Sequence, residues 1–192
     1  MPANDQTLLD DGSIKIRVVT TVSPITSIVE GIGGERIALT GIIPEGVNSH
    51  TFDPAPSTAI AFSNADIMFM NGLYLEEPAL EMALKNKQEN SNIVLLGNTT
   101  LEKSKWIYDF SFPKEQGIPN PHLWTDPVLA LEYASIIFLE LSKIDPLGEP
   151  YYRTNYDTFE RRIFDLDSRI KVAVGSIPEA NRKLLTYHDS FP

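Results

Sequence analysis

The sequence contains no cysteine, which excludes disulfide bonds, thiolate metal ligands and thiol nucleophiles from this chain. Histidine is almost as scarce, with three residues in 192. No apolar run approaches the ~20 residues that a membrane-spanning helix needs. Basic residues are also in the minority, because 16 lysines and arginines face 26 aspartates and glutamates, for a net charge of −10. This balance argues against nucleic acid as a partner, since nucleic-acid-binding surfaces are basic.

The remaining composition is that of a globular protein, with 42% hydrophobic and 22% charged residues. A chain of this length can bury a core without disulfides and suits one domain or slightly more. Residues 1–13 form a polar leader without the basic-then-apolar pattern of a secretory signal. We interpret this leader as the part of the chain that follows a removed signal sequence.

Predicted strands and helices alternate along residues 14–143. Apolar and β-branched segments predict the strands, and capped or amphipathic segments between them predict the helices. The predicted strands are 14–20, 36–44, 66–72 and 92–97. The predicted helices are 23–34, 57–65, 75–87 and 127–143. This order predicts βαβ units around a parallel sheet, and therefore an N-terminal α/β lobe at 14–143.

Local signals refine two of the helices and leave one segment irregular. Ser23 is the expected N-cap of the first helix, and Thr125 or Asp126 is the expected cap of the helix at 127–143. Residues 98–121 show no regular pattern. Structureless stretches of this length are uncommon unless they are functional or mobile.

A single apolar stripe runs along residues 149–175, with apolar side chains at spacings of three and four. The stripe consists of Tyr152, Tyr156, Phe159, Ile163, Leu166, Ile170 and Ala173. It predicts one linking helix, which would be about 40 Å long at 1.5 Å per residue and would act as a rigid strut. A further strand is predicted at 182–188. We therefore expect residues 182–192 to begin a second, truncated α/β lobe.

The three histidines occupy similar positions in this scheme. His50 follows the second strand, His122 precedes a capped helix, and His188 ends the last predicted strand. Each one alone could be an ordinary loop residue. Together they favour a common site, because ligands of open parallel sheets bind beyond the carboxyl ends of the strands.

Three imidazoles would suit zinc and would tolerate manganese or iron. They leave one coordination position for another group. A carboxylate there gives a closed binding site, whereas water gives an open hydrolytic site. The residues alone leave both alternatives open.

Four short motifs resemble one known family. The segment HTFDPAPS at 50–57 resembles the H-x-[YF]-[ED]-P-x-P-S turn of the metal-binding receptors of bacterial ABC importers for zinc and manganese, also called the cluster A-I or lipoprotein receptor antigen family. NADIMFMNGLYLE at 64–76, NPHLWTDP at 120–127 and TYHDSF at 186–191 resemble three further family segments in the same order. The resemblance extends over residues 14–192.

The resemblance implies two α/β lobes joined by a long helix, with the metal bound between the lobes. It assigns His50, His122 and His188 to three ligand positions, and it places a fourth ligand, a carboxylate, beyond residue 192. It also implies a binding protein rather than an enzyme. Such a protein lies in the periplasm or outside the cell, captures zinc or alternatively manganese, and delivers it to an ABC permease. Membrane attachment would come only through a lipid anchor outside this chain.

Two departures from the family pattern affect these expectations. Some zinc receptors carry a histidine-rich loop at the position of residues 98–121, and this chain has no histidine there. Manganese therefore stays open, although a histidine at position 188 favours zinc. In addition, a chain without the second lobe cannot form the cleft, so we expect it to bind metal weakly or not at all.

Two other function classes remain as alternatives. A zinc-dependent hydrolase with three histidine ligands would need a general base, and Asp189 is the candidate, although helix capping explains Asp189 as well. The other alternative is a surface adhesion module without a transport role.

Glu76 and Glu77 are adjacent, so they diverge on a helix and make a poor acid–base pair. Trp124 is expected to pack beneath the His122 turn.

Overall fold

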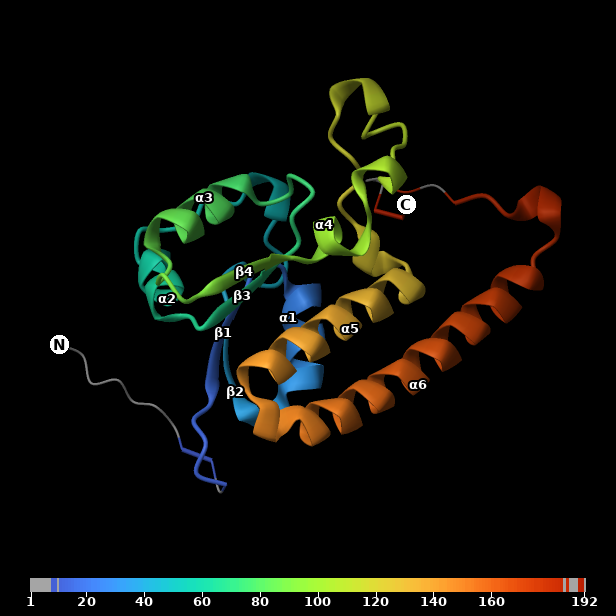
Figure 1. The fold of residues 1–192 in the computed structure, drawn as a ribbon. Helices are drawn as coiled ribbons and strands as arrows, with labels where there is room; N and C mark the ends of the chain where they lie inside the picture. Colours follow the sequence, from blue (N-terminus) through green and yellow to red (C-terminus); the bar gives the residue numbers. More distant parts are fainter. Residues whose placement is uncertain (1–7, 10, 185, 187–189, 192) are drawn as a thin grey trace.

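The computed structural model describes residues 8–9, 11–184, 186 and 190–191. These residues form a parallel four-stranded sheet with helices on both faces (Figure 1). The strands are β1 Ile16–Thr20, β2 Ile37–Gly41, β3 Ile67–Met70 and β4 Asn92–Leu95, in the spatial order β2-β1-β3-β4. The predicted α/β class and parallel sheet are confirmed.

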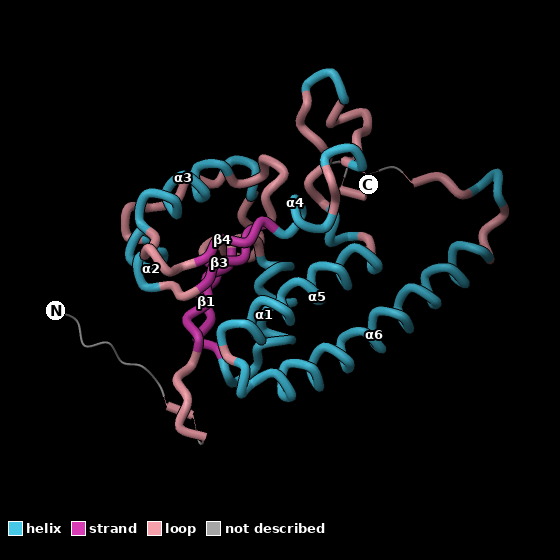
Figure 2. The backbone as a smooth tube through the Cα atoms, viewed as in Figure 1, coloured by secondary structure: helices cyan, strands magenta, loops and turns pink. Residues whose placement is uncertain are grey.

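Helices cover the sheet in two layers. They are α1 Ser23–Gly33, α2 Thr58–Asn64, α3 Glu77–Asn86, α4 Leu96–Thr100, α5 Pro127–Ile144 and α6 Glu149–Gly175. Figure 2 shows α2 and α3 on one side of the strands and α1, α5 and α6 on the other. In β3, Ile67 and Phe69 join the core beneath α1 and α5, whereas Met68 and Met70 join the core beneath α2 and α3. Both faces of this strand are buried, which explains its uninterrupted apolar sequence.

The carboxyl ends of three strands meet at one edge of the sheet. Thr20 at the end of β1 aligns with Gly41 in β2 and with Phe69 in β3. The pairing continues past β2, because the Ile42 N–H donates to the Thr20 carbonyl at 2.9 Å. The segments that follow β1, β2 and β3 therefore begin side by side, and this edge is where the sequence analysis expects a ligand site.

The helix starts agree with the sequence prediction at α5 and differ at α1. Asp126 caps α5, because its carboxylate accepts hydrogen bonds from two backbone N–H groups of the first turn. Thr125 does not cap α5, since its hydroxyl donates to carbonyl groups. The prediction that Ser23 caps α1 was wrong. Val22 has the extended backbone of the cap position, so Ser23 already lies in the first turn.

Helix α4 was not predicted from the sequence. Its residues LGNTT include a glycine and two β-branched threonines, which have low helix propensity. Tertiary contacts stabilise this short helix instead. Leu96 and Gly97 are buried, and the Gly97 N–H donates to the Asn71 carbonyl at 2.9 Å. The rest of the segment up to residue 121 contains short 3₁₀ turns and irregular chain, as expected.

Helix α6 has the bounds that the apolar stripe predicted. Its first half packs on α1 and α5, with Tyr152 fully buried and Phe159 half-buried. Its second half diverges from α5 (Figure 1), and Leu166 and Ile170 are each 42% exposed there. Helix α6 therefore extends beyond the first lobe, with part of its apolar stripe uncovered.

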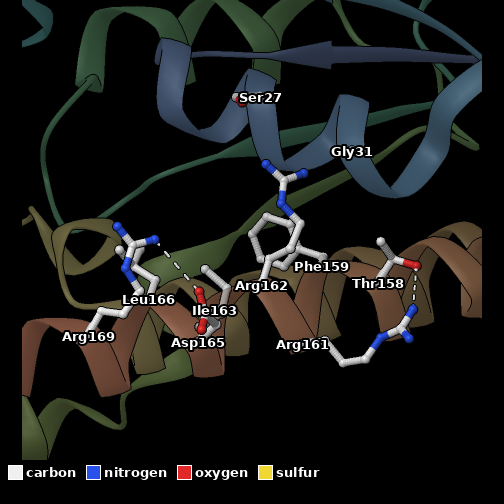
Figure 3. A pocket seen from close by; sticks show the side chains of 10 residues that line it. All are labelled: Ser27, Gly31, Thr158, Phe159, Arg161, Arg162, Ile163, Asp165, Leu166 and Arg169. Atoms are coloured by element: carbon white, nitrogen blue, oxygen red, sulfur yellow. Dashed lines mark hydrogen bonds and ion pairs between the residues drawn. The ribbon is translucent and has the colours of Figure 1, made fainter.

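A groove of about 690 Å³ lies between α1 and the second half of α6. Figure 3 shows Arg162 directed from α6 toward α1 across this groove, while Arg169 pairs with Asp165 along α6 itself. No histidine lines it. Among the described residues, no helix is both long and apolar enough to span a bilayer.

The strand predicted at 182–188 is not formed at residues 182–184 and 186, the described part of that segment. A β-strand needs a neighbouring strand to receive its backbone hydrogen bonds, and within the described residues the sheet ends at β2 and β4. The beginning of a second lobe at 182–192 and the domain boundaries drawn from the sequence stay predictions.

Candidate metal centre

His50 lies in a short 3₁₀ turn, Ser49–Thr51, in the loop after β2. The Asn48 side chain caps this turn, because its Oδ1 accepts a hydrogen bond from the His50 N–H at 3.0 Å. After the turn, Phe52 packs against the main core, the one beneath α1 and α5, and Pro54 is buried. The loop is therefore fixed on both sides of His50, whereas His50 itself is exposed.

His122 precedes the 3₁₀ turn Leu123–Thr125 that leads into α5. It is only 5% exposed. Two hydrogen bonds hold its turn: the Thr125 hydroxyl donates to the His122 carbonyl at 2.8 Å, and the Asn71 Nδ2 donates to the Pro121 carbonyl at 3.0 Å. Because Asn71 directly follows β3, the second bond places the His122 turn at the carboxyl edge of the sheet.

The Nε2 atoms of His50 and His122 lie 3.2 Å apart, although 72 positions separate the residues in sequence. The two ring centroids are 5.2 Å apart and the ring planes are tilted by 54°. Two nitrogens that each lie about 2.0–2.1 Å from one tetrahedral zinc ion are about 3.3 Å from each other. The separation in the structure therefore fits two ligands of a single ion.

A chain of side chains sets the tautomer of His122. The Asn120 Nδ2 donates to the Asp109 carboxylate, so the Asn120 Oδ1 faces the other way. That oxygen accepts hydrogen bonds from the His122 N–H at 3.0 Å and from the His122 Nδ1 at 2.7 Å. The Nδ1 therefore carries the proton, and the Nε2 presents a lone pair toward His50. Metal-binding histidines are oriented by outer hydrogen bonds of this kind.

Aromatic rings surround the histidine pair. Phe112 lies 6.1 Å from the His50 ring in a stacked arrangement and 5.9 Å from the His122 ring in an edge arrangement. Trp124 lies 5.3 Å from the His122 ring and packs against the main core, as expected. Both rings therefore pack beside the buried His122, whereas the exposed His50 ring faces Phe112 alone of the two.

The third predicted ligand, His188, lies outside the described residues. Within the part of the chain that the structure describes, no three His, Cys, Asp or Glu side chains gather into a group that could hold a metal ion. The described donors are thus two imidazoles, half of a tetrahedral set. The described residue Ser190 lies close by, because its carbonyl accepts a hydrogen bond from the Thr125 Oγ1 at 2.7 Å.

A buried carboxylate, Glu76, lies at the same edge of the sheet and is 2% exposed. Its oxygens accept hydrogen bonds from the Thr21 hydroxyl at 2.7 Å, the Asn71 N–H at 2.6 Å and the Gly72 N–H at 3.2 Å. Burial raises the pKa of Glu76 to about 7, against the opposing effect of these hydrogen bonds. Glu77 is exposed, so the two carboxylates diverge as predicted.

Three residues beside the histidine pair were not predicted from the sequence: Asp109, Phe112 and Asn120. Asp109 and Phe112 belong to the irregular segment, where no periodicity indicates which side chains turn inward. Asn120 did carry a signal, because it opens the NPHLWTDP motif. Its proximity to His122 could have suggested a supporting hydrogen bond, since asparagine often bonds to backbone groups two residues away.

Comparison with known proteins identifies the family. The family described as "ZnuA: Zinc-uptake complex component A periplasmic" matches residues 18–192. The chain belongs to the ZnuA family. The expected family resemblance is thereby confirmed, and the periplasmic setting of the family agrees with the extracytoplasmic location expected from the sequence.

The relatives that resemble this chain include proteins named for different metals. The manganese-binding lipoprotein MntA of Halalkalibacterium halodurans is 30% identical over 98% of this chain and 59% of its own length. The periplasmic zinc-binding protein TroA from Treponema pallidum has a TM-score of 0.77 at 24% identity, over 85% of this chain and 57% of its own. A zinc-bound ZnuA with residues 138–173 deleted has a TM-score of 0.80 at 23% identity, over 92% and 64%. The chain thus spans about three fifths of the length of these relatives.

The outer hydrogen bonds of His122 give a first prediction for this ZnuA-family chain. Replacing Asn120 with Ala removes the acceptor for the His122 Nδ1 and releases the imidazole. We expect affinity for divalent metal ions to fall about 10- to 100-fold, the range for loss of such a partner. Titration of the full-length protein with a competing chelator measures this. Asn90→Ala, on the exposed loop before β4, is the control and should leave affinity unchanged; equal affinities for the Asn120→Ala variant and the wild type would contradict the assignment.

The buried Glu76 gives a second prediction, for stability against pH. Its folded pKa of about 7 exceeds the ordinary value of 4.5, so the folded state retains a proton that the unfolded state releases. The free energy of unfolding should therefore fall as pH rises from about 4.5 to 7, by roughly 3 kcal/mol from this group. Glu76→Gln should remove this component. Denaturant unfolding at several pH values measures it, and parallel pH profiles for the variant and the wild type would disprove it.

Proposed function

We propose that this protein captures a divalent transition-metal ion outside the cytoplasmic membrane and delivers it to the permease of an ABC importer. Zinc is the favoured ion, with manganese as the alternative. The observation that carries the proposal is the 3.2 Å approach of the His50 and His122 Nε2 atoms. His188 is proposed as the third ligand, and a carboxylate beyond residue 192 as the fourth.

The metal preference follows from the donor atoms. Imidazole nitrogen binds zinc more strongly than manganese in a site of given geometry, since zinc lies later in the order of divalent metal affinities. A third imidazole at His188 would strengthen this preference. The relatives include proteins named for manganese and for zinc, so family membership alone does not choose between the two ions.

A receptor role agrees with the surroundings of the site better than hydrolysis does. A zinc hydrolase needs a general base close to a metal-bound water. Glu76 is a buried carboxylate with a pKa near neutrality, but its oxygens already accept bonds from Thr21, Asn71 and Gly72. It is therefore committed to the fold, and Asp189, the base considered from the sequence, lies outside the described residues. The relatives are named as substrate-binding proteins of metal transporters, which supports the same choice.

Release of the ion is proposed to occur by rearrangement of ligands. Helix α6 continues without a break from Glu149 to Gly175, so a lobe attached to its far end would follow a stiff strut rather than a flexible hinge. His50 is the exposed member of the pair and lies on a loop, whereas His122 is buried. We propose that His50 leaves the ion before His122 does.

Metal analysis tests the proposal. The full-length protein should bind about one zinc ion per molecule, and His50→Ala or His122→Ala should weaken zinc binding by more than about 100-fold, beyond the effect of losing an outer partner. Competition between zinc and manganese in the same titration decides the preferred ion.

A matched control separates a defined site from general attraction of cations to an acidic protein. Glu89→Gln removes an exposed negative charge on the loop before β4 and should leave the stoichiometry and affinity unchanged. If either histidine variant bound zinc like the wild type, or if Glu89→Gln had the larger effect, the proposed site would be wrong.

A further inference from the structure

We propose that Asn71 is a positioning residue for the metal site: it fixes the Pro121–His122 peptide at the end of β3, and Glu76 fixes the turn that carries Asn71. The inference rests on the proposed function. It extends the site from the histidine loops into the sheet, to residues that lie in a different segment of the chain.

The turn after β3 has an unusual backbone. Gly72, Leu73 and Tyr74 have φ values of 75°, 52° and 64°, so three consecutive residues are in the left-handed region. Leucine and tyrosine rarely adopt this conformation, which is unfavourable for side chains with a Cβ atom. Strained residues of this kind persist only where their surroundings hold them, and they cluster at functional sites.

Two side chains hold this strained turn. The Glu76 carboxylate accepts hydrogen bonds from the N–H groups of Asn71 and Gly72, and the Asn98 Oδ1 accepts one from the Leu73 N–H at 3.0 Å. Glu76 also accepts a hydrogen bond from the Thr21 hydroxyl, which connects Glu76 to the end of β1. The turn is therefore attached to β1, to α4 and to its own carboxylate.

The Asn71 side chain connects this turn to the candidate metal site. It is fully buried. Its Oδ1 accepts the Tyr133 hydroxyl at 2.8 Å, which orients the amide so that Nδ2 donates to the Pro121 carbonyl at 3.0 Å and to the Gly72 carbonyl at 3.1 Å. Of these bonds, the one to Pro121 is the direct connection between the strand end and the segment of His122.

The Pro121 carbonyl belongs to the peptide group that begins His122. Holding this carbonyl fixes the plane of that peptide, and the His122 N–H on its other side donates to the Asn120 Oδ1. The Pro121–His122 peptide group is thus held at both its C=O and its N–H, while Asn120 also holds the His122 ring. Without Asn71 the buried Pro121 carbonyl would lose this partner, which favours a shift of the turn toward another donor.

The test compares variants of the full-length protein by zinc titration and by ¹⁵N spectra of the metal-free histidines. Asn71→Ala removes the donor to Pro121. We expect zinc affinity to fall about 10-fold or more and the His122 ring nitrogens to shift away from the Nδ1–H pattern. Should this variant fold poorly, Asn71→Asp keeps the size and the acceptor for Tyr133 while replacing the donor, and the same two changes are expected.

Tyr152→Phe is the matched control. It removes another tyrosine hydrogen bond, from the buried Tyr152 to Asp145 at 2.9 Å, which does not touch Asn71 or Pro121, so stability should drop while zinc affinity stays within about threefold. Thr100→Val removes a buried hydroxyl that has no partner among the described residues, and should change neither property.

The outcomes separate this inference from the proposed function. If the Asn71 variants keep wild-type affinity and unchanged His122 signals, or if Tyr152→Phe weakens zinc binding as strongly as they do, Asn71 has only a structural role and the inference is overturned. If the wild type itself binds neither zinc nor manganese, the proposed function fails, and the His122 signals of the metal-free variants still decide whether Asn71 positions this residue.

Discussion

Parallel pairing of β1 with β2 and β3 is the constraint on which the candidate site depends. It aligns Thr20, Gly41 and Phe69, so that the chain leaves these strands at one edge. The His50 loop starts there directly, whereas the His122 turn arrives from a distant segment and is joined to the end of β3 through Asn71. Two imidazoles 72 positions apart in sequence can meet at 3.2 Å because the sheet supplies this common edge.

The same edge carries groups that reduce stability. Glu76 is a buried carboxylate whose charged form is disfavoured by burial, and the turn beside it places Leu73 and Tyr74 in the left-handed region. A chain folded for stability alone would not need either feature. They are compensated by the two apolar cores on both faces of the sheet, in which Phe69 and Met70 are almost fully buried. The arrangement is typical of a rigid scaffold that holds a strained functional edge.

Much of the fold could be predicted because its signals are periodic or local. The apolar stripe predicted both ends of α6, and Asp126 with the proline after it predicted the start of α5. Ser23 misled the prediction, since serine is accepted both at the cap and in the first helical turn. Helix α4 could not be predicted, because its stability comes from burial of Leu96 and Gly97 rather than from propensity.

The site could be predicted only in part. His50 and His122 could be proposed as ligands because histidine is scarce and both follow or precede recognisable elements. Asp109 and Phe112 were not, since their orientation is set by the tertiary structure of an irregular segment. The burial of Glu76 could not be predicted from its position beside Glu77. Its burial depends on the strand end around it, which a sequence pattern does not specify.

X-ray absorption spectroscopy of the zinc-loaded full-length protein directly tests whether the histidines bind the ion. It reports the identity of the bound atoms and their distances from the ion. We expect at least two imidazole nitrogens at about 2.0–2.1 Å from the ion, with the outer-shell scattering that histidine rings give. A first shell made only of oxygen atoms, without imidazole scattering, would contradict it.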